Sequence, residues 1–348
     1  MIGPIAAQRR QWLVLMPLAA LATIVVAWTV AWYLAARQAD SIITAWIERE
    51  ARAGRIYTCG ARQAGGFPFR IEIRCTDPAV ELTATDPPLV LKAKELVGVA
   101  QIYEPTVIVA EIAGPLSIAE SGQSAAWRAD WRLAQASLRG IARIPQRLSV
   151  VLDDVRLEQT GAGAAEPWAA ASHLEFHLKH DPEQERGQPV LDVAIQVGGA
   201  TLPNGLPLSG KPLDGEVSAI LRGISDFRPK PMPVRLKEWQ AAGGRLQVSK
   251  LRLQQGDAVA VAAGEIGLSA AGRPDGAFDI TISGFDRLVQ DLLGGRPGGV
   301  RLGLIAGISL LGKPAEIDGK RAVAMALRLN DGAMSLGPIP LGKLAPLY

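Results

Sequence analysis

The sequence predicts a mainly β protein, in which an N-terminal transmembrane helix is followed by a large, curved, antiparallel sheet domain and a few short helices. Residues 12–36 form an apolar segment that carries no charge. From Arg55 onward, apolar and polar residues alternate with the period of two that is typical of β-strands. The 37 glycines and 24 prolines among 348 residues indicate many turns.

The apolar segment is long enough to be an uncleaved membrane anchor. It reads WLVLMPLAALATIVVAWTVAWYLAA, and a helix of about 25 residues is about 37 Å long, more than the hydrocarbon core of a bilayer requires. Trp12 stands at one edge, while Trp28, Trp32 and Tyr33 cluster toward the other, as interfacial aromatic residues do. A cleaved signal peptide is the alternative, but its apolar region is shorter, about 7–15 residues.

The segment after the anchor predicts a helical stalk. Ile43, Trp46 and Ile47 recur at helical spacing, and Gly54 is a typical helix terminator. We therefore expect four regions along the chain, which are a tail at 1–11, a transmembrane anchor at 12–36, a helical stalk at 37–54 and a β-rich domain at 55–348.

The only two cysteines, Cys59 and Cys75, lie on either side of a strong turn signal. Each is eight residues from Phe67, and the flanking segments have strand-like composition. A hairpin centred on Phe67, with its tip at Gly66–Pro68, would place the cysteines opposite each other and within reach of a disulfide. Two unrelated free thiols are the alternative. The turn motif consists of Gly65, Gly66, Phe67, Pro68, Phe69 and Arg70.

The predicted disulfide also indicates an orientation in the membrane. Arginines lie on both sides of the anchor, and a count of basic residues alone does not favour a cytoplasmic N-terminus. A disulfide persists only in an oxidising compartment. We therefore expect the tail at 1–11 in the cytoplasm and the β-rich domain at 55–348 in the periplasm.

Alternation of apolar and polar residues predicts eleven strands and three short helical pieces. The helical pieces are Pro233–Ala242, Phe285–Leu293 and Leu302–Leu311. The predicted strands are Leu89–Gln101, Thr106–Ile112, Ala126–Leu138, Arg147–Gln159, His173–Lys179, Val190–Val197, Gly215–Leu221, Arg245–Gln254, Ala258–Leu268, Ala277–Ser283 and Val323–Leu329.

Two segments of the β-rich region resemble each other, at 147–197 and 245–284. In both, alternation changes phase once, at Asp153–Asp154 and at Ser249–Lys250. Such a change is what a bulge or bend produces in a strand. We interpret the two segments as a duplicated unit, with a chance coincidence of β patterns as the alternative.

The sequence contains no pattern that indicates an enzyme. His173 and His177 would share the polar face of a strand with Glu175, which is typical of a solvated face, and Asp153 and Asp154 would point apart. No nucleophile, phosphate-loop or dinucleotide motif occurs. We therefore identify no catalytic, cofactor-binding or metal-ligating residue, and expect no cofactor. The net charge of +3, without a long basic run, gives no support to a nucleic-acid partner.

Three features together resemble an uncharacterised bacterial envelope family, the domain of unknown function 2125. They are the N-terminal anchor, the hairpin between the cysteines and the stretch IYEPTVIVAEIAGPL at Ile102–Leu116. The C-terminal segment around GGRLQVSKLRLQQG is similar to the same family and, more loosely, to AsmA-type envelope proteins. The resemblance implies a single-pass protein of the bacterial inner membrane, and the AsmA likeness implies lipid handling through an apolar sheet groove. The family carries no assigned catalytic residues that could be transferred.

The sequence therefore favours a membrane-anchored periplasmic protein that binds or carries a lipid or another apolar ligand. The alternative is a non-enzymatic structural or assembly factor of the envelope, whose sheet docks a protein partner. A continuous apolar channel on the sheet would favour the first hypothesis, and a filled core with an exposed edge would favour the second.

Overall fold

The computed structural model describes residues 4–140, 144–160, 167–180, 189–203, 208–209, 211–227, 230–284 and 312–348, with side chains from residue 15 onward. Its fold is mainly β, with strands that pair antiparallel, as predicted. The chain divides into two compact units. The first unit is Met1–Ile112 with Ile118–Ser124, and the second unit is Ala113–Ser117 with Ala125–Tyr348.

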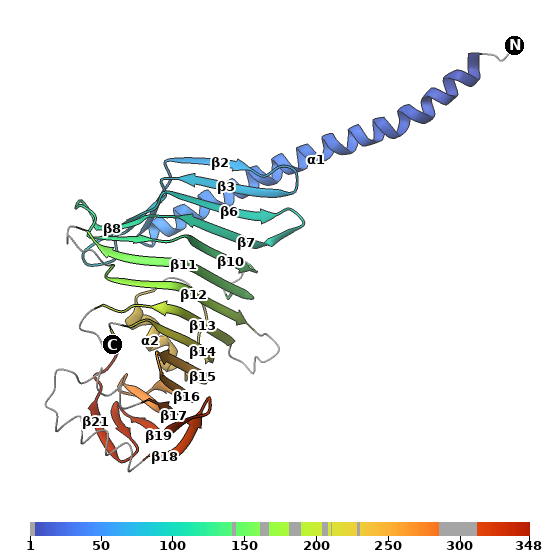
Figure 1. The fold of residues 1–348 in the computed structure, drawn as a ribbon. Coiled ribbons are helices and arrows are strands. Elements are labelled where there is room, and N and C mark those ends of the chain that lie inside the picture. Colours follow the sequence, from blue (N-terminus) through green and yellow to red (C-terminus); the bar gives the residue numbers. More distant parts are fainter. Residues whose placement is uncertain are drawn as a thin grey trace. The chain divides into compact units, whose positions relative to one another are not determined.

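Helix α1 (Pro4–Arg52) joins the predicted anchor and stalk into one continuous helix (Figure 1). Most of its large apolar side chains between Leu15 and Leu34 are exposed. Within the described chain, α1 is the one helix that is long and apolar enough to cross a membrane. Arg49 and Arg52 lie in the last turn, where cations interact favourably with the helix dipole.

The first unit contains two small antiparallel groups of strands. In one group β2 pairs with β3 and β3 with β6, and in the other β1 pairs with β4 and β4 with β5. The chain passes between the two units within β7 (Glu104–Ala113) and β8 (Leu116–Glu120). The other bounds are β1 (Arg55–Thr58), β2 (Ala61–Gly65), β3 (Arg70–Thr76), β4 (Ala79–Leu82), β5 (Leu89–Lys92) and β6 (Glu95–Gln101).

In the second unit, consecutive strands from β11 to β17 pair side by side, and β19 follows β17. Strands β9 and β10 pair with β11 at one end, and at the other end β18 and β20 pair with β19 and β21 with β20. The bounds are β9 (Trp127–Asp130), β10 (Leu133–Arg139), β11 (Arg147–Gln159), β12 (Ala169–His180), β13 (Val190–Ala200), β14 (Leu213–Arg222), β15 (Arg245–Gln255), β16 (Ala258–Leu268), β17 (Pro274–Ser283), β18 (Lys313–Ile317), β19 (Lys320–Asn330), β20 (Ala333–Leu336) and β21 (Ile339–Lys343).

The register of these pairings gathers apolar residues on one face of eight neighbouring strands. Directly paired residues share a face, and alternate residues of a strand return to it. One row crosses β11–β17 and β19 through Val150, Phe176, Ile195, Val217, Leu251, Ala262, Ile280 and Met325, and is called the central apolar row. Two flanking rows are also apolar or glycine, one from Leu148 to Leu327 and the other from Leu152 to Val323.

The packing of this apolar face differs from one row to the next. At one end of the strands, Leu178 and Leu191 are buried with Ile144, and Leu148, Phe176 and Val193 pack against this cluster. In the central apolar row, every residue except Ala262 is only half-buried. The face is therefore sealed at one end and partly open along its middle.

The predicted change of phase at Ser249–Lys250 is confirmed. The register of β15 against both β14 and β16 shifts there, so Val248 and Leu251 lie on the same face. The corresponding bulge predicted at Asp153–Asp154 is wrong, because β11 keeps the same register with β12 on both sides of Asp154. Asp154 instead adopts a positive φ of 53°. The duplication and the curvature of the sheet stay predictions.

Most predicted strands have observed counterparts, often longer by several residues. The helix predicted at Pro233–Ala242 is α2 (Met232–Ala241). Two predicted strands are wrong as single elements, because the chain breaks each of them in two. Leu89–Gln101 forms β5 and β6, and Ala126–Leu138 forms β9 and β10. The helical pieces predicted at Phe285–Leu293 and Leu302–Leu311 lie outside the described residues.

Candidate functional site

The turn motif forms the tip of the hairpin between β2 and β3. Gly65 pairs with Glu72, and the Arg70 N–H donates to the Gly66 carbonyl oxygen at 3.1 Å, which closes the loop. Gly66 has a φ of 95°, and a Cβ there would lie 2.7 Å from the Arg70 carbonyl oxygen. The position therefore requires glycine, both for its backbone conformation and for lack of space.

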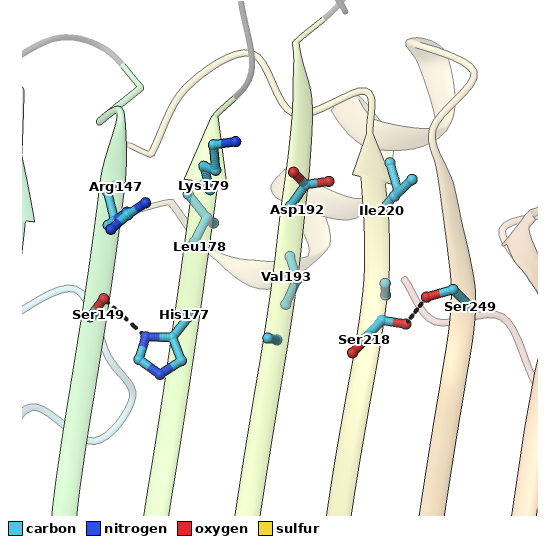
Figure 2. Close-up of a pocket in the computed structure, with 12 residues that line it drawn as sticks. Arg147, Ser149, His177, Leu178, Lys179, Asp192, Val193, Ser218, Ile220 and Ser249 are labelled. Carbon is cyan, nitrogen blue, oxygen red and sulfur yellow. Dashed lines mark hydrogen bonds between the residues drawn. The ribbon is translucent and has the colours of Figure 1, made fainter.

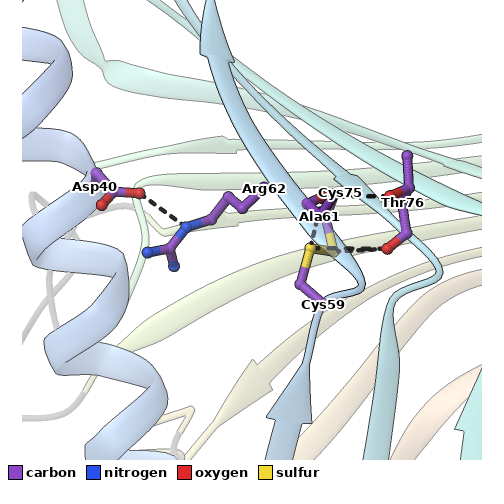
Figure 3. Close-up of a disulfide and its surroundings, with 6 residues drawn as sticks. All are labelled: Asp40, Cys59, Ala61, Arg62, Cys75 and Thr76. Atoms are coloured by element: carbon purple, nitrogen blue, oxygen red, sulfur yellow. Dashed lines mark hydrogen bonds and ion pairs between the residues drawn. A yellow bond between two sulfur atoms is a disulfide. The ribbon is translucent and has the colours of Figure 1, made fainter.

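A disulfide joins Cys59 to Cys75, as predicted, with their Cα atoms 5.7 Å apart (Figure 3). The expected geometry is wrong in one respect, because the two cysteines are not paired across the hairpin. Cys75 pairs with Arg62, since the hairpin is centred between Pro68 and Phe69 rather than on Phe67. Cys59 lies before β2, in the link from β1, so the bond ties this link to β3.

Two tryptophans of α1 hold the hairpin tip against the helix. The indole Nε1 of Trp28 donates to the Pro68 carbonyl oxygen at 2.9 Å, and that of Trp32 donates to the Arg70 carbonyl oxygen at 2.8 Å. The Phe67 ring packs edge-on against Trp32, with the ring centroids 5.6 Å apart. The sequence predicted these tryptophans as an interfacial belt, but gave no sign that they bind the hairpin.

Farther along α1, polar and aromatic contacts continue the same interface. The Arg62 guanidinium lies 2.8 Å from the Asp40 carboxylate (Figure 3). It also donates to the Thr44 hydroxyl at 2.9 Å. Trp46 packs against Tyr57 of β1, with the ring centroids 4.7 Å apart and the rings tilted by 42°. The helix is thus joined over several turns, from Trp28 to Trp46, to both small groups of strands in the first unit.

The hairpin tip nevertheless exposes aromatic side chains. Phe67 is 51% exposed and Phe69 is 66% exposed. The neighbouring turn between β6 and β7 adds Tyr103, which is 74% exposed, and the Ile102 N–H donates to the Phe69 carbonyl oxygen at 3.1 Å. Phe67, Phe69 and Tyr103 are together called the aromatic tip. Sequence reasoning missed Tyr103, although it lies in the IYEP stretch that carried the family resemblance.

The polar face of the second unit holds a chain of hydrogen-bonded charged groups. His173 lies 2.6 Å from Asp153 through Nδ1 and 3.0 Å from Glu175 through Nε2. His177 in turn lies 3.1 Å from Glu175 and 3.0 Å from the Ser149 hydroxyl. His173, Glu175 and His177 share one face, as predicted, and their side chains remain partly exposed.

An open depression of about 610 Å³ lies on this polar face (Figure 2). Ser149 and His177 line it, together with Asp192, Ser218 and Ser249 from the next three strands outward. Ser149, His177 and Glu175 are connected in series by hydrogen bonds, and the side chains of His177 and Glu175 are partly exposed to water. Among the residues that the structure describes, no group of three or more His, Cys, Asp and Glu side chains is placed to hold a metal ion.

The hydrogen bonds of this chain shift several pKa values. The bond to Asp153 raises the pKa of His173 above its ordinary 6.5, and the same bond lowers the pKa of Asp153. The bond to His177, followed by that to His173, lowers the pKa of Glu175. The arrangement therefore favours a protonated His173 between two ionised carboxylates.

We predict that the contribution of His173 to stability depends on pH. A raised pKa means that this contribution is complete below 6.5 and is lost as the pH rises through the folded-state value. Thermal melting of the protein and of a His173→Gln variant should therefore differ most below pH 6.5 and converge as the pH rises through the folded-state pKa of His173. The effect is small because the side chain is exposed. A difference that grows toward alkaline pH would contradict the assignment.

A model of the family described as "Uncharacterized protein conserved in bacteria (DUF2125)" matches residues 32–345. The chain belongs to this family. The match begins at Trp32, which binds the hairpin, so it includes the aromatic tip, the disulfide and the strands of both units. No curated protein matches the chain. The looser likeness to AsmA-type proteins stays a prediction.

Proposed function

We propose that this DUF2125 protein is a non-enzymatic, single-pass protein of the bacterial inner membrane that binds or carries a lipid or another apolar ligand in the periplasm. Helix α1 supplies the anchor, with its N-terminal end in the cytoplasm. The second unit supplies the ligand surface, on the face that carries the central apolar row. Tethering keeps this surface close to the membrane that contains its ligand.

The observation that carries the proposal is the half-buried central apolar row. An ordinary core buries its large apolar residues, because leaving a Val, Leu, Ile or Phe side chain exposed forfeits about 1.5–3 kcal/mol. Here Phe176, Ile195, Val217 and Leu251 come from four successive strands and remain partly open to solvent. Contiguous apolar surface that stays exposed commonly marks a binding site.

The disulfide supports the periplasmic location. A bond between Cys59 and Cys75 persists in an oxidising compartment and is rare in the cytoplasm. These cysteines follow α1 in the chain, so an uncleaved α1 with its C-terminal end outside the cytoplasm satisfies both features.

A protein partner that covers the same face is the alternative, in which case the protein is an assembly factor. An apolar ligand is favoured because the apolar rows cross eight strands without interruption by a charge.

The test is to extract the full-length protein from its membrane in a mild detergent and to identify bound molecules by mass spectrometry. We expect phospholipid or another long-chain lipid to remain with the protein through purification. An unrelated single-pass protein prepared in the same way provides the background of adhering lipid. Recovery of lipid only at that background, or of a stoichiometric protein partner instead, would contradict the proposal.

A further inference from the structure

The aromatic tip lies beside the part of α1 that the membrane contains. Trp28 and Trp32 belong to the apolar segment, and both donate to carbonyl oxygens of the hairpin. Arg37 is the first charged residue after that segment. At 1.5 Å per residue, Trp28 lies about 13 Å and Trp32 about 7 Å along the helix axis before Arg37.

Counting residues from the N-terminal end of the apolar segment places the bilayer boundary at the same part of the helix. A hydrocarbon core about 30 Å thick takes about 20 helical residues, which from Trp12 reaches the neighbourhood of Trp32. The bilayer boundary therefore falls between Trp28 and Arg37 by either count. The carbonyl oxygens of Pro68 and Arg70 are hydrogen-bonded at that boundary, so the hairpin tip cannot lie far out in the aqueous phase.

The chemistry of the tip fits this position. Gly65–Phe69 carries no charge, and Phe67, Phe69 and Tyr103 expose rings that a soluble surface gives no reason to leave uncovered. Aromatic residues are enriched at the level of the lipid headgroups. Arg70 follows directly; its guanidinium lies 3.1 Å from the Glu72 carboxylate, and its side chain is 58% exposed, as long basic side chains are at interfaces.

We propose that the aromatic tip inserts into the outer leaflet interface of the same bilayer that α1 crosses. The first unit is then held at the membrane by two elements, the helix and the hairpin, and the disulfide fixes the base of the inserted hairpin. This inference rests on α1 spanning the membrane, which belongs to the proposed function, but it is independent of the apolar face of the second unit.

The test places an environment-sensitive fluorophore on single introduced cysteines in the full-length protein. The native cysteines are bonded to each other, so Phe69→Cys or Tyr103→Cys supplies the one reactive thiol. The protein is reconstituted into vesicles of phosphatidylethanolamine and phosphatidylglycerol. Emission is then quenched either by lipid that carries a nitroxide on its acyl chain or by aqueous iodide.

Two further sites provide matched controls. Val25→Cys reports on the span itself. Thr85→Cys lies in the turn after Thr83, whose N–H donates to the Gly54 carbonyl oxygen at 2.9 Å, at the far end of α1. Gly54 is 26 residues beyond Trp28, about 39 Å at helical rise, so this turn is far from the bilayer boundary.

We expect quenching by the nitroxide lipid to be several-fold stronger at residues 69 and 103 than at 85, with iodide quenching in the reverse order. Quenching at 25 together with aqueous behaviour at both 69 and 103 would overturn the insertion while leaving the anchor intact. Aqueous behaviour at 25 as well would overturn the anchor and the insertion together. The Tyr103→Cys variant retains Phe67 and Phe69, so weak quenching by the nitroxide lipid at residue 103 could not be attributed to the loss of a phenylalanine ring.

Discussion

Replacing both cysteines, as Cys59→Ala with Cys75→Ala, should lower the free energy of unfolding of the first unit by about 3 kcal/mol. The bond closes a loop with a sequence separation of 16 residues, and a loop of that size constrains the unfolded chain by about this amount. The bond also ties the link between β1 and β2 to β3, and through β3 to β6. Burial contributes little to the sheet of β2, β3 and β6, since among the described residues of these strands only Cys75 is buried.

Amide hydrogen exchange on the full-length protein in detergent measures this effect unit by unit. A loss of about 3 kcal/mol corresponds to exchange of the β3 and β6 amides about 100-fold faster, where exchange requires unfolding of the unit. The amides of β12 and β13 in the second unit provide the internal control and should not change. Unchanged exchange in β3 would show that the bond contributes nothing to stability.

The same two cysteines report the compartment in intact cells. If the first unit is periplasmic, the thiols resist alkylation until a reductant is added, because they are already bonded. Ready alkylation of both cysteines without reductant would reverse the proposed orientation. Alkylation tests the location, and hydrogen exchange tests the stability, so the two outcomes are independent.

Local sequence patterns predicted strands and bulges well where the alternation of apolar residues matches the face that is buried. The phase change at Ser249–Lys250 predicted a bulge, because a strand without one would turn Leu251 and Leu253 to the polar face. The same argument failed at Asp154. There the backbone adopts a positive φ while both neighbouring strands keep their register, and aspartate is one of the residue types that tolerates this conformation.

Contacts between residues far apart in the sequence could not be predicted from local sequence patterns. The symmetry of Cys59 and Cys75 about Phe67 predicted the right bond with the wrong register, because the turn closes from Gly66 to Arg70. The hydrogen bonds from Trp28 and Trp32 join residues 40 and 38 positions apart, and no periodicity links them. The apolar rows similarly depend on how eight strands align, which alternation within a single strand does not determine.

The second large effect is expected at Val217, in the middle of the central apolar row. A Val217→Asp change places a carboxylate where an apolar ligand would cover it, and an uncompensated buried charge is strongly unfavourable. Without ligand the side chain stays partly hydrated, because Val217 is only half-buried. The variant should therefore lose most of its bound lipid and keep nearly all of its fold stability.

Ser218→Asp is the matched control. Ser218 is the next residue of β14, so it lies on the opposite, polar face, where its direct neighbour on β15 is Lys250. The change introduces the same side chain one position away, next to a cation. Its bound lipid and its melting temperature should both equal those of the unchanged protein.

The amount of lipid bound per protein in these two variants, measured by mass spectrometry alongside thermal melting, tests the apolar-ligand proposal most directly. We predict strong loss of lipid in Val217→Asp, no loss in Ser218→Asp, and melting temperatures within a few degrees of each other. A folded Val217→Asp protein that retains its full complement of lipid would contradict the proposal. Unfolding of Val217→Asp alone would also contradict it, because the face would then be an ordinary sealed core.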